Sequence, residues 1–189
     1  MNSLLGSYDT GTCRRTSINV IRNLNARFVN NWHHALENSS KLDFYRKCKQ
    51  NFAREKYLQI ENFTHRREIT RLRISAHKLN VEQDRYRTPP IPRDQRFCTF
   101  CSKVLALNNI EDECHLLDEC QLYTSARILF RRYTNKEPSD VFINSSNLDE
   151  LTRLGRFISN SMDLHTAFKN YLDVLPTDGP SLLNRCTLL

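Results

Sequence analysis

Four side chains of the types that bind zinc recur at short spacing between Cys98 and Cys120. Cys98 and Cys101 form a Cys-x2-Cys pair, and after thirteen intervening residues His115 and Cys120 form a His-x4-Cys pair. Zinc in proteins takes about four nitrogen or sulfur ligands in a tetrahedron, and a catalytic zinc keeps one position open for water. Four protein ligands close that shell, so we predict one structural Zn²⁺ ion bound by Cys98, Cys101, His115 and Cys120.

Two alternatives to this ligand set stay open. Cys114, next to His115, is a possible substitute ligand, and the cysteines could instead be unrelated core thiols, because free cysteine is usually buried. The backbone between His115 and Cys120 must also allow both side chains to face one ion. In a continuous α-helix Cys120 would lie roughly 140° around the axis from His115. We therefore expect a helix that starts near Ile110 to break at Asp118 and Glu119, with Cys120 on a turn or opening the next helix.

The elements that position these ligands are predicted to be helical. The chain has 189 residues, 39% of them hydrophobic, and only four glycines. Apolar residues recur every three or four positions, which is typical of amphipathic helices, in the ranges 16–38, 41–51, 54–60, 64–77, 123–133 and 147–172. In the first range Trp32 is expected to anchor a core, and in the fifth Arg127 is expected on the outer face. The predicted fold is mainly α, a small helical domain with a zinc knuckle of three cysteines and one histidine and short or no strands.

Composition also divides the chain. Three prolines between residues 89 and 92 exclude a helix interior and predict an extended strap. We expect a loose N-terminus at 1–15, a basic helical region at 16–87, the strap and zinc knuckle at 88–134, a C-terminal helical region at 135–175 and a tail at 176–189.

Positive charge is concentrated ahead of the zinc knuckle. The whole chain has a net charge of +7, whereas fifteen Lys or Arg and seven Asp or Glu between Lys41 and Arg96 give that segment +8. Such a segment favours binding to nucleic-acid phosphates, with a steep dependence on salt, and the aromatic residues interleaved with it suit single strands. The alternative is an ordinary solvated helix face. The residues predicted to contact phosphate are Arg66, Arg67, Arg71, Arg73 and Lys78.

Other features bound the location of the protein. No apolar run approaches the ~18 residues of a membrane span, and the N-terminus lacks the pattern of a secretory signal. Cysteines in a metal-type cluster, without such a signal, are typical of a reducing compartment. We expect an intracellular protein, nuclear or cytoplasmic.

Several of these segments together resemble part of a known family. The run Ile69-Thr70-Arg71-Leu72-Arg73-Ile74-Ser75-Ala76-His77-Lys78-Leu79 resembles the leucine-arginine-small-x-histidine-x-leucine segment upstream of the zinc knuckle in reverse transcriptases of non-LTR retrotransposons. The knuckle itself also resembles the knuckle of those enzymes. Upstream of it, the resemblance to the jockey-like endonuclease–reverse transcriptase polyproteins extends to Trp32, Ser40-Lys41-Leu42, Tyr45 and Glu55-x-Tyr57-Leu58. The resemblance covers roughly residues 29–168 and lies beyond the polymerase of those proteins. Cys114 departs from the family pattern, which has an apolar residue there.

The resemblance implies a role in nucleic-acid binding, to RNA or DNA, without catalysis. The parent polyprotein would be an RNA-directed DNA polymerase, but this chain lacks the aromatic-x-Asp-Asp motif of the polymerase carboxylates and has no room for an endonuclease core. We therefore expect no enzymatic activity from the chain by itself. The alternatives are a protein–protein interaction module stapled by zinc, whose basic face meets an acidic partner, or a non-functional transposon remnant.

Overall fold

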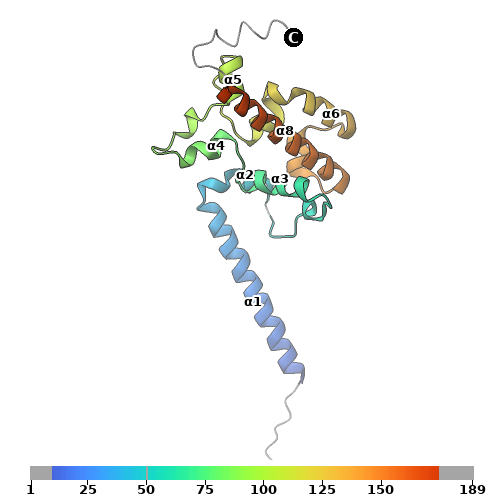
Figure 1. The fold of residues 1–189 in the computed structure, drawn as a ribbon. Coiled ribbons are helices and arrows are strands. Elements are labelled where there is room, and N and C mark those ends of the chain that lie inside the picture. The colour runs from blue at the N-terminus through green and yellow to red at the C-terminus, as the bar shows by residue number, and fades with distance from the viewer. Residues whose placement is uncertain (1–9, 50, 175–189) are drawn as a thin grey trace, which may run out of the picture. The chain divides into compact units, whose positions relative to one another are not determined.

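The computed structural model describes residues 10–49 and 51–174 (Figure 1). The described residues form two compact units, which divide between Asp43 and Phe44. The expected tail at 176–189, and residues 1–9 of the expected loose N-terminus, lie outside the described residues.

The first unit consists of one long helix and a short turn. Helix α1 spans Thr10–Glu37, and a 3-10 turn, η1, follows at Ser40–Leu42. The helix starts at Thr10 and not at residue 16, so residues 10–15 of the expected loose N-terminus are helical. Its apolar stripe is largely exposed: Ile21 and Phe28 are 58% and 59% exposed, and Trp32 is only half-buried. Trp32 is not among the residues of the described core, and its role as a core anchor stays a prediction.

The second unit is built from short helices and one long C-terminal helix. They are α2 (Asp43–Cys48), η2 (Lys56–Gln59), α3 (Phe63–Arg73), α4 (Asn80–Gln83), η3 (Asp84–Tyr86), η4 (Arg93–Gln95), α5 (Thr99–Val104), η5 (His115–Glu119), η6 (Gln121–Tyr123), α6 (Thr124–Thr134), α7 (Pro138–Asn144) and α8 (Leu148–Val174). Among the described residues there is no strand, only an isolated antiparallel bridge between Phe97 and Ile110. The prediction of a mainly α fold is confirmed.

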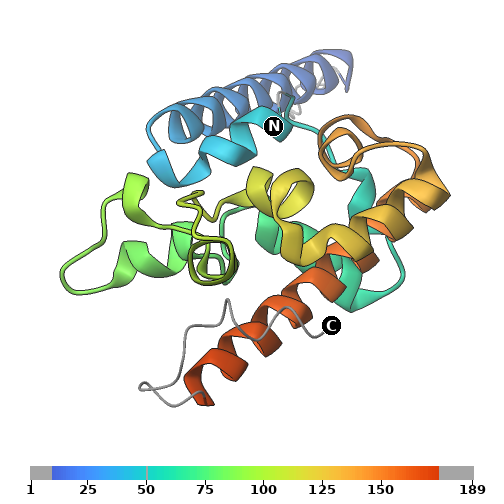
Figure 2. The same ribbon diagram turned by 90° about the horizontal axis from the view of Figure 1, so that it is seen from above.

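Helices α3 and α8 pack against each other at the centre of this unit (Figure 2). Ile69 and Leu72 of α3 and Leu154 and Ile158 of α8 are almost completely buried. The two backbones come close because α8 has a glycine at the crossing: a Cβ atom on Gly155 would lie 2.6 Å from the Cβ atom of His65. The start of α8 is as predicted, since the Asn147 side chain accepts hydrogen bonds from the backbone N–H groups of Asp149 and Glu150.

The chain departs from the predicted helices at two places near the site. The third predicted helix ends at Arg73, and Ser75 then adopts a left-handed conformation (φ 50°) that turns the chain toward the knuckle. A helix, α7, forms at Pro138–Asn144, outside the six ranges with predicted helical periodicity, and its proline stands at the favoured first position. None of the described helices is long and apolar enough to cross a bilayer.

Candidate metal centre

The four predicted zinc ligands come together in one buried cluster. The ligand atoms of Cys98, Cys101, His115 and Cys120 all lie within 4.8 Å of one another. The Cys98 and Cys120 sulfurs are 3.7 Å apart, and those of Cys101 and Cys120 are 3.9 Å apart. The Cys101 sulfur lies 3.3 Å from Nε2 of His115. Cys114 is a half-buried free thiol outside the cluster.

These separations fit a tetrahedral zinc site. With Zn–S bonds of about 2.3 Å, two sulfurs of a tetrahedron lie roughly 3.8 Å apart, and the observed sulfur separations fall on both sides of that value. They are much too long for a disulfide, whose S–S bond is about 2.05 Å. The cluster can therefore hold one metal ion such as zinc, in a shell that leaves no position for a substrate.

A π-helical turn brings His115 and Cys120, which are five residues apart, to the same side of the chain. Residues His115–Glu119 form a π-helical turn, η5, closed by a hydrogen bond from the Cys120 N–H to the His115 carbonyl (2.8 Å). In such an i→i+5 turn the residue five positions on returns over the first one. Cys120 itself has left the helix, with extended backbone. The predicted break is therefore present, and the widened turn brings both ligands to the same side.

Contacts around the ligands hold them in place. Nδ1 of His115 lies 3.1 Å from Oε2 of Glu119, which leaves Nε2 directed at the cluster. The guanidinium of Arg127 donates hydrogen bonds to the carbonyls of Cys120 and Leu116, at both ends of the π turn. Arg127 is only 4% exposed, so its predicted place on the outer face of α6 is wrong. Helical periodicity could not predict this position, because the partners of Arg127 are carbonyls outside α6.

The thiols of the cluster differ strongly in acidity. The hydrogen bond with Cys120 lowers the pKa of Cys98 to about 5, whereas burial raises the pKa of Cys101 to about 11. The hydrogen bond to Cys98 also raises the pKa of Cys120. Zinc binds cysteine as the thiolate, and a dication favours the thiolate form of each cysteine ligand. Metal binding here would therefore release protons from the buried sulfurs.

Two buried glutamates connect the knuckle to the helical body. Oε1 of Glu113 accepts a hydrogen bond from the Ser75 hydroxyl (2.9 Å) and lies 3.0 Å from Nε2 of His77. Burial raises the pKa of Glu113, but the hydrogen bond with His77 and the charge of His77 more than offset this, so its pKa is lowered overall. Ser75 and His77 belong to the segment with the family resemblance. Because both contact Glu113, they are structural partners of the knuckle.

The second glutamate, Glu111, reaches in the same way to α4 and α8. Its Oε2 accepts a hydrogen bond from the Asn80 N–H (2.8 Å), and its Oε1 lies 3.2 Å from Nε2 of His165. The sequence predicted a helix that starts near Ile110, but Ile110 forms the bridge with Phe97 and the helical conformation begins only at Glu113. The long-range partners of Glu111 and Glu113 had no signal in the sequence.

The five residues predicted to contact phosphate do not share one environment. Arg73 is 3% exposed, and its guanidinium donates a hydrogen bond to the Phe142 carbonyl (2.6 Å) between the rings of Tyr57 and Phe142. Arg73 therefore faces the core and is removed from the phosphate-contact set. Arg66 is half-buried and donates to the Ile60 carbonyl (2.7 Å).

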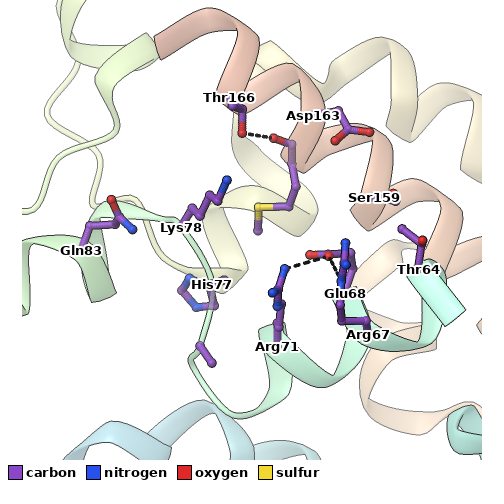
Figure 3. A pocket seen from close by; sticks show the side chains of 12 residues that line it. Thr64, Arg67, Glu68, Arg71, His77, Lys78, Gln83, Ser159, Asp163 and Thr166 are labelled. Atoms are coloured by element: carbon purple, nitrogen blue, oxygen red, sulfur yellow. Dashed lines mark hydrogen bonds and ion pairs between the residues drawn. The ribbon is translucent and has the colours of Figure 1, made fainter. Parts of the chain in front are cut away.

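The other three, Arg67, Arg71 and Lys78, line a hollow of about 320 Å³ between α3, α8 and the chain that follows α3 (Figure 3). We call it the α3–α8 hollow. Oε1 of Glu68 accepts from Nε of Arg67 (2.9 Å) and from Nη1 of Arg71 (3.2 Å), which fixes both guanidinium groups at the hollow. From α8, Asp163 and Thr166 also line the hollow. The hollow is thus lined by three cations: Arg67 and Arg71 have N–H donors beyond those bound to Glu68, and Lys78 adds its ammonium group.

Comparisons of the chain with protein-family models, with curated proteins and with solved structures give no match.

Proposed function

We propose that this protein is a nucleic-acid-binding module whose fold is stabilised by one zinc ion. The observation that carries the proposal is the convergence of Arg67, Arg71 and Lys78 at one hollow. Two guanidinium groups held by a shared carboxylate, with Lys78 beside them at the hollow, suit phosphate, because guanidinium groups bind phosphate oxygens through paired N–H donors. Zinc bound by the cluster would stabilise the knuckle, whose Glu113 holds Ser75 and His77 in the segment that leads to Lys78.

The proposed role is to hold a nucleic acid, without cleaving or polymerising it. The four-ligand shell leaves no open coordination site for metal-assisted hydrolysis. The chain also carries no aromatic-x-Asp-Asp motif for phosphoryl transfer. The origin from the C-terminal region of a jockey-like retrotransposon polyprotein stays a prediction, which agrees with this role but rests on the resemblance alone.

Salt-titrated binding tests the proposal. We would measure fluorescence anisotropy of labelled RNA and DNA oligonucleotides with the zinc-loaded protein, from about 50 to about 200 mM salt. Three phosphate contacts predict that log K falls against log [salt] with a slope of about −2 for single strands. Absence of binding at the lowest salt would refute the proposal and favour the protein-interaction module.

A further inference from the structure

An exposed aromatic ring stands beside the α3–α8 hollow. Phe63, the first residue of α3, is 63% exposed. Its position is fixed because Asn62 caps the helix, with Oδ1 accepting a hydrogen bond from the His65 N–H (3.0 Å). The next residue, Thr64, already lines the hollow. The ring and the hollow are therefore contiguous on one surface.

A single exposed phenylalanine is ordinary in a folded protein. Phe63 differs because it shares an arginine with the hollow: the guanidinium carbon of Arg67 lies 5.8 Å from the ring centroid, and that of Arg66 lies 5.7 Å from it. Arg67 also lines the hollow and is fixed there by Glu68. One guanidinium thus links an aromatic surface to a group of phosphate-type donors.

We propose that this surface binds single-stranded nucleic acid, with one base stacked on the ring of Phe63 and a neighbouring phosphate held in the hollow by Arg67, Arg71 and Lys78. The inference rests on the proposed function and narrows it to single strands. Aromatic rings beside a basic groove are the usual means of binding single strands, because every base offers a π-face. The recognition is therefore expected to tolerate any base.

A duplex does not satisfy the same arrangement. Its bases are paired and stacked on each other, so no base face is free for Phe63, and only the phosphate contacts remain. Burying the exposed ring of Phe63 under a base adds apolar contact and stacking to the charge interactions. Single strands should therefore bind more tightly than a duplex of the same sequence.

The test compares variants of the exposed ring. The zinc-loaded protein, Phe63→Leu and Phe63→Tyr would each be titrated with a labelled single strand and with its duplex. Leucine keeps an apolar side chain but cannot stack, whereas tyrosine keeps the ring. We expect Phe63→Leu to weaken single-strand binding about tenfold, consistent with the contribution of one stacked base. Phe63→Tyr should bind like the unaltered protein, and duplex binding should not change.

The hollow is tested by charge removal with a matched control. Arg67→Ala combined with Arg71→Ala should make the salt slope for single strands shallower by about 1.4, the value for two lost phosphate contacts. Arg131→Ala combined with Arg132→Ala removes the same charge from exposed positions on α6 and should change the slope much less.

The outcomes separate this inference from the proposed function. If Phe63→Leu binds single strands like the unaltered protein, or if the two arginine pairs behave alike, while binding itself stays salt-dependent, only this inference is overturned. Equal affinity for single strand and duplex would overturn it as well. If the unaltered protein binds no nucleic acid at low salt, the proposed function falls with it.

Discussion

Replacement of Arg73 by methionine should destabilise the fold strongly, although the sequence places this residue among surface arginines. Methionine retains the apolar length of the side chain but leaves the Phe142 carbonyl without its donor. A hydrogen bond to a charged group contributes about 1.5 to 3 kcal/mol. The guanidinium carbon also lies 5.1 Å from the Tyr57 ring centroid and 4.9 Å from that of Phe142, and such cation–π contacts contribute about 0.5 to 1 kcal/mol or more each.

The sum predicts a loss of about 3 kcal/mol in the free energy of unfolding. An ion pair with Glu55, whose Oε2 lies 3.4 Å from Nη1 of Arg73, is broken as well. For a protein of this size that loss corresponds to a decrease in Tm of about 6 to 12 °C. Urea denaturation followed by circular dichroism, at one fixed concentration of free zinc, measures the difference.

Arg71 provides the matched control for Arg73. It lies two residues away on α3 and its side chain is 45% exposed, so Arg71→Met should change stability by no more than about 0.5 kcal/mol. Under conditions where it is folded, Arg73→Met should keep the salt dependence of nucleic-acid binding. Arg71→Met should make that salt dependence weaker. If Arg73→Met were as stable as the Arg71 variant, the assignment of Arg73 to the core would be refuted.

Two further predictions concern the metal and the helix crossing. The purified protein should contain one zinc per chain, and His115→Ala should lose it together with much of its helical content, because metal binding in such sites contributes directly to folding. Cys114→Ser should retain the zinc by elemental analysis, and its loss there would contradict the ligand set. Gly155→Ala should lower stability by about 1 to 3 kcal/mol, since its methyl group would lie 2.6 Å from an atom of the facing turn of α3. Thermal unfolding measures this effect, with Asn160→Ala at an exposed position of the same helix as the control. Equal Tm values for Gly155→Ala and Asn160→Ala would show that α3 and α8 can move apart without loss of stability.

The sequence by itself predicted the cluster of four metal-type side chains and the helical class. A Cys-x2-Cys pair followed by a histidine and a cysteine is a local pattern, and zinc restricts which residue types and spacings can meet around it. The break before Cys120 followed from helix geometry alone. The long C-terminal helix, α8, was equally clear, because its apolar residues repeat over many turns and Asn147 supplies a cap.

Only the tertiary structure decided which arginines are exposed. Periodicity treats an arginine in a basic helix as a surface residue, but Arg73 meets a carbonyl and a ring of Phe142, 69 residues further along the chain. Arg127 is buried for a related reason, because its guanidinium donates to the carbonyls of Leu116 and Cys120 in the turns before α6. Burial of a charge depends on partners that are distant in sequence. For that reason the spacing of residues predicted the metal cluster, while the extent of the cationic surface required the folded chain.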